Sequence, residues 1–161
     1  MAQTRFDRTA SMSLHRLIYF SRQAFSDPRD VDFEVGRIIR ASIANNRLVD
    51  VTGLLLVHQD WFVQVLEGNY THVQTTYGRI AADPRHRDAT VITAGPADRR
   101  EFGDWNMCAR TTSDLDGEIL DALDQRGTFD PARLTGSSAM RLLRSVAQIQ
   151  SGERSAIARV A

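Results

Sequence analysis

The sequence contains no lysine, because all 20 of its basic residues are arginine. This absence excludes Schiff-base chemistry, a lysine general base and the phosphate-binding lysine of a P-loop. The single cysteine, Cys108, excludes an internal disulfide and any zinc or iron–sulfur site built from several cysteines. We therefore expect a protein of the reducing cytoplasm without lysine-dependent catalysis.

Net charge and long apolar runs are also missing. The 20 arginines are balanced by 20 acidic residues, whereas tight nucleic-acid binding requires a strong positive field. No apolar run approaches the roughly 18 residues of a membrane span, and residues 1–13 lack the apolar centre of a signal peptide. The four histidines lack the i, i+4 spacing of a helical metal site. We expect no direct nucleic-acid partner, no membrane and no metal.

The apolar periodicity predicts an α+β fold. Runs rich in apolar and β-favouring residues predict strands at 14–21, 51–57, 61–66, 89–94 and 102–109. Apolar residues at helical spacing predict helices at 31–46 and from about 69 to the Asp83-Pro84 pair. The resulting order is that of a ferredoxin-like βαββαββ sheet with two helices on one face.

Beyond Thr111 the composition changes and predicts a pair of helices at 114–123 and 137–150. We expect this C-terminal helical pair to cover the open face of the sheet. The predicted organisation is a flexible or disordered tail at 1–13, a sheet domain at 14–110, a helical cap at 111–150 and a flexible tail at 151–161.

Two polar side chains fall on apolar faces of predicted strands. Strand alternation places Tyr19 beside Leu17 on one face, and it places Gln64 between Phe62 and Leu66. A buried amide without partners costs about 1 to 3 kcal/mol, so Gln64 needs a polar neighbour. The alternatives are a core tyrosine bonded to the backbone and a glutamine that faces water at a strand edge.

Other polar residues extend apolar stripes. Asn45 and Asn46 each lie seven residues after an isoleucine, close to two helical turns, and so continue the apolar face of the first helix. For this pair the alternative is that the two residues simply cap the end of the helix. Arg79 lies in the second predicted helix, and the alternative for it is an ordinary surface charge. Trp105 and Met107 share a face of the last strand, where core packing is the alternative. The loop Asp83 to His86 is typical of a turn that caps itself.

Taken in order, these residues closely resemble one family of sensor domains. The segments that carry the resemblance are RLIYFS at 16–21, NN at 45–46, TGLLL at 52–56, FVQVLEG at 62–68, RI at 79–80, DPRH at 83–86 and WNM at 105–107. They resemble the BLUF family of blue-light sensors that use FAD, from about Leu14 to Arg110.

The resemblance implies a non-covalent FAD site between the two helices. In the family, the isoalloxazine ring is lined by apolar residues that match Ile38 and Phe62. The ring's polar groups are contacted by residues that match Asn45, Asn46 and Arg79. The resemblance also implies that Tyr19 hydrogen-bonds Gln64, which faces the flavin, and that Trp105 or Met107 lies near Gln64.

The same resemblance implies a photoreceptor rather than an enzyme. Tyr19 would transiently give the excited flavin an electron and a proton, and Gln64 would return with a changed set of hydrogen bonds. The expected partners are a second copy of the chain, a separate protein effector, or both. The residues alone leave two alternatives open: a small acylphosphatase-like hydrolase, in which Arg79 binds phosphate and Asn46 positions water, and a colourless regulator that binds a metabolite.

Overall fold

The computed structural model of the chain describes residues 13–25, 27–104, 108–111 and 129–160. The regular elements of the first half are β1 (Leu14–Gln23), α1 (Val31–Leu48), β2 (Thr52–His58), β3 (Trp61–Asn69) and α2 (Tyr70–Ala82). They are followed by β4 (His86–Pro96), β5 (Cys108–Thr111) and α4 (Gly136–Val160). Short 3-10 turns cover Pro28–Asp30 and Pro131–Arg133.

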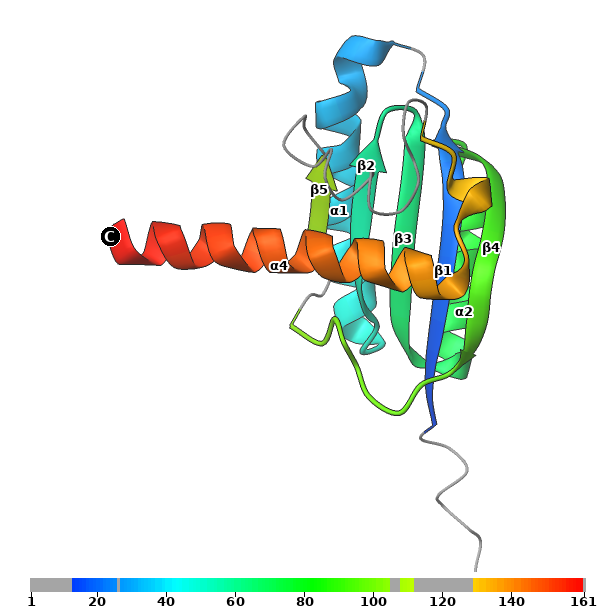
Figure 1. The fold of residues 1–161 in the computed structure, drawn as a ribbon. Helices are drawn as coiled ribbons and strands as arrows, with labels where there is room; N and C mark the ends of the chain where they lie inside the picture. The colour runs from blue at the N-terminus through cyan, green and yellow to red at the C-terminus, as the bar shows by residue number, and fades with distance from the viewer. Residues whose placement is uncertain (1–12, 26, 105–107, 112–128, 161) are drawn as a thin grey trace, which may run out of the picture.

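The strands form one sheet in the order β4-β1-β3-β2-β5 (Figure 1). The first four strands of this order pair antiparallel, which confirms the ferredoxin-like arrangement. Strands β2 and β3 are joined by a short turn after His58 and pair directly with each other. The register places Tyr19 of β1 directly opposite Gln64 of β3. The two polar residues singled out in the sequence are therefore neighbours at mid-sheet.

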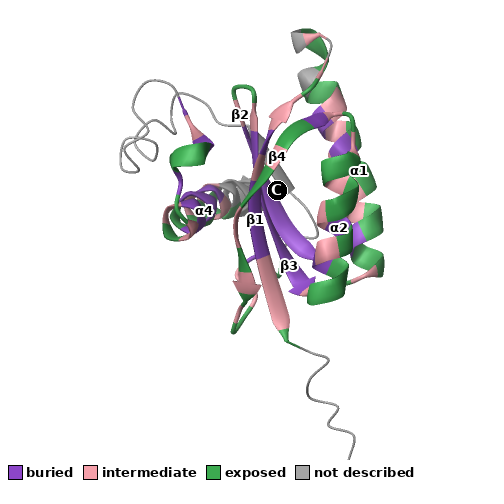
Figure 2. Ribbon diagram, turned by 90° about the vertical axis from the view of Figure 1, so that its right-hand side faces the viewer, coloured by how far each residue is buried: buried purple, intermediate pink, exposed green. Residues whose placement is uncertain are grey.

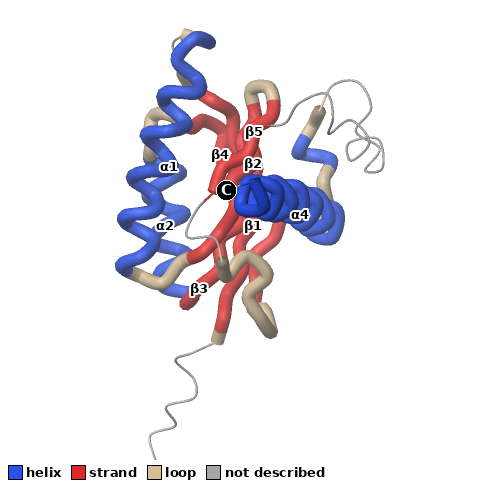
Figure 3. The backbone as a smooth tube through the Cα atoms, turned by 90° about the vertical axis from the view of Figure 1, so that its left-hand side faces the viewer, coloured by secondary structure: helices blue, strands red, loops and turns tan. Residues whose placement is uncertain are grey.

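The molecule has three layers, with the sheet in the middle. Helices α1 and α2 lie side by side on one face and α4 crosses the other (Figures 2 and 3). Strand alternation supplies two cores: Leu17, Tyr19 and Phe62 belong to the core under α1 and α2, while Ile18 and Val63 belong to the core under α4. The predicted division of β1 into two faces is confirmed, and so is the covering of the second face by a C-terminal helix.

The ends of α1 and α2 follow from local hydrogen bonding. The Asn69 side chain accepts a hydrogen bond of 2.9 Å from the backbone N–H of Thr71 and so caps the start of α2. This helix ends at Ala82, before Asp83 and Pro84, as predicted. Helix α1 continues two residues past the predicted end, to Leu48, and the carbonyl of Asn46 accepts from the N–H groups of the two loop residues 49 and 51.

The region after β4 differs from the prediction. A strand was predicted at 102–109, whereas the strand β5 begins at Cys108 and pairs parallel with β2. Phe102 lies in the preceding loop, where it is almost completely buried in the core under α4. Its backbone N–H donates to the buried Glu67 carboxylate at 3.0 Å, so this loop residue is buried without a strand partner.

The C-terminal helix is longer than predicted. The sequence pattern predicted a helix at 137–150 and a tail from 151, whereas α4 runs from Gly136 to Val160. Figure 1 shows α4 crossing the sheet and continuing past β5. The first helix of the predicted pair, at 114–123, lies outside the described residues.

Two glycines provide a test of this packing. A Cβ atom added to Gly53 of β2 would lie 2.0 Å from the carbonyl oxygen of Val65 on β3, whereas one added to Gly78 of α2 would meet no atom within 4 Å. We expect Gly53→Ala to lower the free energy of unfolding by at least about 2 kcal/mol, because the backbone of β3 must move. Gly78→Ala should raise it by about 0.5 to 1 kcal/mol through helix propensity. Urea denaturation followed by circular dichroism measures both, and equal effects would contradict the described sheet contact.

Candidate functional site

The centre of the candidate site is a hydrogen bond between β1 and β3. The hydroxyl of Tyr19 donates to the side-chain carbonyl oxygen of Gln64. Tyr19 is 0% exposed and Gln64 is 3% exposed. Burial raises the pKa of Tyr19 far above its usual value, with smaller contributions from Tyr77 and Asp83. The phenol is therefore neutral and remains a hydrogen-bond donor at any physiological pH.

A cavity of about 380 Å³ lies between α1 and α2. Four of the predicted cofactor-binding residues line it: Ile38, Asn45, Asn46 and Arg79. Ile38 and Asn46 are buried, whereas Asn45 and Arg79 are exposed at the rim. The combination of apolar walls with amide and guanidinium groups is typical of a small-molecule site, whose volume is roughly 300 to 1,000 Å³.

The other two predicted cofactor-binding residues do not line this cavity. Phe62 and Gln64 are both buried on β3, on the face that α1 and α2 cover. Phe62 lies next to the cavity because its ring centroid is 4.7 Å from that of His86, which does line it. Gln64 is hydrogen-bonded to Tyr19, and Tyr19 in turn contacts α2, because its ring centroid is 5.2 Å from that of Tyr77.

Ser21 and His86 form a buried pair that was not predicted from the sequence. His86 Nδ1 lies 2.8 Å from the hydroxyl oxygen of Ser21, and both residues are buried. Burial lowers the pKa of His86 to about 4, an effect that the nearby Asp83 opposes. Strand alternation could have found Ser21, because it lies on the same face of β1 as Tyr19.

The loop before His86 is the self-capping turn that the sequence predicted. The Asp83 carboxylate accepts from the backbone N–H of Arg85 at 2.9 Å and pairs with its guanidinium at 2.6 Å. The hydrogen bonds from Arg85 hold the pKa of Asp83 below its usual range. These bonds fix the end of α2, and so they fix the wall of the cavity that Asp83, Arg85 and His86 form.

Some predicted features are not tested by this arrangement. Trp105 and Met107 lie outside the described residues. Within the described ranges, no cluster of three or more His, Cys, Asp or Glu side chains is placed to hold a metal ion. Among the same residues, no helix combines the length and the apolar character needed to span a membrane.

The burial of His86 predicts a pH dependence of stability. Its folded pKa of about 4 lies below the ordinary value of 6.5, so the unfolded chain binds more protons between these values. The contribution of His86 to the free energy of unfolding is therefore fully present at pH 7 and is lost as the pH drops from about 6.5 to about 4. A shift of this size corresponds to about 3 kcal/mol.

Urea denaturation of the ligand-free protein at pH 7, 6, 5 and 4.5 measures this loss. His86→Asn, which keeps a polar atom near Ser21 but does not titrate, should lose markedly less stability over the same range. Parallel pH profiles of the two proteins would show that His86 is not held neutral by burial.

Comparison with known proteins identifies the family. Residues 14–108 match the family model described as sensors of blue light using FAD. The chain is 33% identical to the photoactivated adenylate cyclase subunit beta of Euglena gracilis over 95 residues, which are 59% of this chain and 11% of that subunit. The chain thus spans about a tenth of the length of this curated relative.

Solved structures agree with this assignment. The dark-state structure of BlrB, a BLUF protein, is similar with a TM-score of 0.65 and 31% identity, over 84% of this chain and 98% of that chain. The photo-activated state of BlsA shares the fold with a TM-score of 0.75 at 22% identity, over 82% of this chain and 93% of that chain. The family match supports neither the hydrolase nor the colourless regulator. The chain belongs to the BLUF family, the blue-light sensors whose cofactor is FAD.

Proposed function

We propose that this chain is a sensor module, rather than an enzyme, that holds the ring system of FAD in the cavity between α1 and α2 in the cytoplasm. The observation that carries the proposal is the buried Tyr19–Gln64 hydrogen bond at the sheet face under these helices. A core tyrosine would be satisfied by a backbone carbonyl, and a core glutamine would be unfavourable without a polar partner. A pair that combines both residues is suited to change its hydrogen bonds.

The residues around the cavity fit a flavin ring. Such a ring is flat and apolar over most of its area and carries an imide with carbonyl oxygens at one end. In our proposal Ile38 and Phe62 contact the apolar area, while Asn45, Asn46 and Arg79 supply the amide and guanidinium groups for the polar end. The neutral His86 adds a polar group to the same wall without adding charge.

The chemistry of the switch divides between the cofactor and the chain. When bound, FAD supplies the absorption of blue light and the ability to take up an electron and a proton. Tyr19 holds its proton toward the carbonyl oxygen of Gln64, and burial raises its pKa so that the phenol does not lose this proton by simple ionisation. Loss of the proton removes the donor that fixes the Gln64 amide. The amide, which has both donor and acceptor groups, can then turn and form a different set of hydrogen bonds.

The test of this proposal is Gln64→Leu. Leucine has a similar volume but no donor or acceptor, so we expect the variant to retain flavin and to lose the light-induced absorption change. A light-minus-dark difference spectrum of the purified protein measures the change. Gln148→Leu on α4 is the matched control, because Gln148 is exposed and its variant should respond normally.

Tyr19→Phe separates the two members of the pair. It removes one hydroxyl from the core, so the protein should fold and bind flavin while the reversible absorption change is lost. A normal red-shifted product in Gln64→Leu would contradict the role of Gln64, and a normal reversible cycle in Tyr19→Phe would contradict that of Tyr19.

We also propose that the signal leaves through α4, toward a second copy of the chain or a separate effector. Glu67 lies three residues after Gln64 on β3 and is completely buried. Its carboxylate accepts from Arg16 Nε at 2.8 Å and from the backbone N–H groups of Glu101 and Phe102 at 3.0 Å. The strand that carries Gln64 therefore holds the loop at 101–102 in place.

The same loop is joined to α4 by an ion pair. The Glu101 carboxylate accepts two hydrogen bonds from the Arg144 guanidinium, one of them at 2.7 Å from Nη2. These bonds hold the pKa of Glu101 below its usual range. Glu67 thus fixes Glu101, and Glu101 contacts α4, so a displacement of β3 reaches α4 through contiguous contacts.

Hydrogen exchange tests this route. We expect the backbone amides of α4 to exchange faster in blue light than in the dark. Arg144→Gln should raise their dark exchange toward the lit level, because it removes the charge that binds Glu101. Arg141→Gln on the same helix should not, since Arg141 makes no ion pair among the residues that the structure describes. Identical exchange of α4 in dark and light would exclude this helix as the output.

A further inference from the structure

The side chain of Arg100, in the loop between β4 and β5, joins three segments that are distant from it in sequence. Its Nη2 donates to the backbone carbonyl of Asp50 at 2.8 Å. Its Nη1 donates to the hydroxyl of Thr52 at 2.8 Å and to the backbone carbonyl of Glu67 at 3.1 Å. A guanidinium can make these bonds together because its N–H groups are fixed in one plane. Arg100 therefore holds the loop after α1 against the start of β2 and the end of β3.

The loop held in this way has a backbone conformation that needs support. Asp50 has a φ of 52°, in the left-handed region that favours glycine. A Cβ atom added to Gly68 of β3 would lie 3.1 Å from the carbonyl oxygen of Asp50, so the loop lies directly against β3. The Asp50 carboxylate also pairs with Arg100 at 3.0 Å, but the Asp50 side chain is 89% exposed and such a pair contributes little. The bond to the Asp50 carbonyl is therefore the contact that fixes the loop.

The same loop fixes the end of α1. The backbone N–H groups of Val49 and Val51 donate to the carbonyl of Asn46, at 3.3 and 3.0 Å. Asn46 is buried and lines the cavity between α1 and α2, whereas Arg100 does not line this cavity. Asp50 lies between the two residues that bond to Asn46. The contact of Arg100 with Asp50 therefore bears on the cavity wall through the backbone of one short loop.

We propose that Arg100 is a positioning residue for the flavin site, which acts through Asp50 and the end of α1 to place the amide of Asn46 at the polar end of the ring. A hydrogen bond weakens steeply when its donor and acceptor are displaced or tilted, so a small shift of Asn46 weakens the binding of the ring. This inference rests on the proposed function, because it requires the ring to lie in the cavity between α1 and α2. It adds to the site a residue that does not itself line the cavity.

The release of FAD from the loaded protein tests the proposal. The dissociation rate is measured after dilution, from the fluorescence of the free flavin. Arg100→Gln removes the forked donor, and we expect it to raise this rate about tenfold, equivalent to about 1.4 kcal/mol of binding free energy. Arg100→Lys keeps the charge and one donor group, so its rate should lie between the two. The light-induced absorption change should still form in both variants, because Tyr19 and Gln64 are unchanged.

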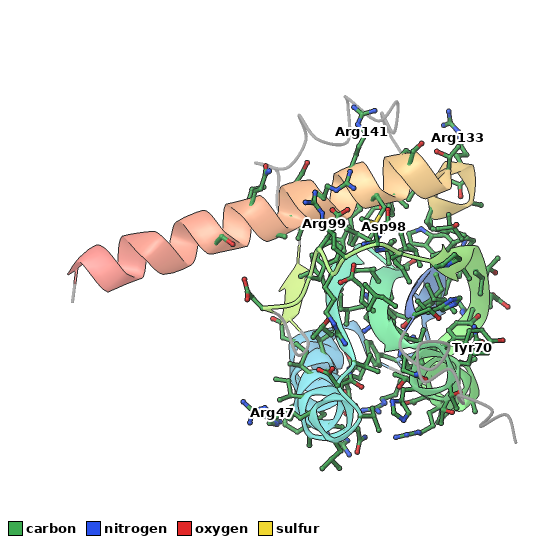
Figure 4. All side chains as sticks on the ribbon, turned by 90° about the horizontal axis from the view of Figure 1, so that it is seen from below. Arg47, Tyr70, Asp98, Arg99, Arg133 and Arg141 are labelled. Carbon is green, nitrogen blue, oxygen red and sulfur yellow. The ribbon has the colours of Figure 1, made fainter. Side chains whose placement is uncertain are left out.

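Arg99→Gln is the matched control. Arg99 is the exposed neighbour of Arg100, and its side chain makes no hydrogen bond or ion pair within the part of the chain that the structure describes. Figure 4 shows Arg99 on the side of the sheet that α4 covers, away from the cavity between α1 and α2. This variant should release FAD at the wild-type rate.

A double variant separates positioning from a general loss of stability. Asn46→Ala alone should raise the dissociation rate of FAD, because it removes the amide. If Arg100 acts through Asn46, Arg100→Gln should raise the rate far less in the Asn46→Ala protein than in the wild-type protein. Full additivity of the two changes, or equal rates in the wild-type, Arg100→Gln and Arg100→Lys proteins, would overturn this inference while leaving the ring cavity intact. A wild-type protein that retains no flavin would overturn the proposed function as well.

Discussion

The buried hydrogen bond between Tyr19 and Gln64 is the interaction around which the site is built. It depends on the register of β1 and β3, because a shift of one residue would move both side chains to the opposite face. The bond also depends on complete burial, since water would otherwise compete for the phenol and the amide. The three layers of the fold provide both conditions by enclosing the centre of the sheet.

Strand β3 has polar side chains on both faces of the sheet, because alternate residues of a strand point to opposite sides. Gln64 faces α1 and α2, whereas Glu67 accepts its hydrogen bonds on the side of Arg16 and the loop at 101–102. A buried carboxylate is costly unless it is paired and hydrogen-bonded, and here one guanidinium and two backbone N–H groups satisfy it. The polar groups of this strand therefore lie on separate faces, Gln64 toward α1 and α2 and Glu67 toward the loop at 101–102 that contacts α4.

Periodicity was sufficient to predict the features that depend on local pattern. The order of the elements predicted the ferredoxin-like arrangement, alternation predicted the shared face of Tyr19 with Leu17, and Asp83-Pro84 predicted the end of α2. The burial of Phe102 in a loop could not be predicted this way, because it depends on the carboxylate of Glu67, which is distant in sequence. The burial of His86 against Ser21 likewise depends on strand pairing. Both are tertiary effects that no short window of sequence contains.

The layer of α1 and α2 is less completely packed than the sheet beneath it. Among the residues that the structure describes, α1 buries Val35, Ile38 and Asn46, and beside the core that these helices share with the sheet lies the cavity between them. A ligand that occupies such a cavity in the folded state alone adds to stability, by about 2.7 kcal/mol at 100 times its dissociation constant. A ligand bound in the cavity would therefore add to the stability of the helices that enclose it. Tyr19 and Gln64 lie on the sheet face under α1 and α2, so a change in their hydrogen bonds acts directly on the layer that encloses the cavity.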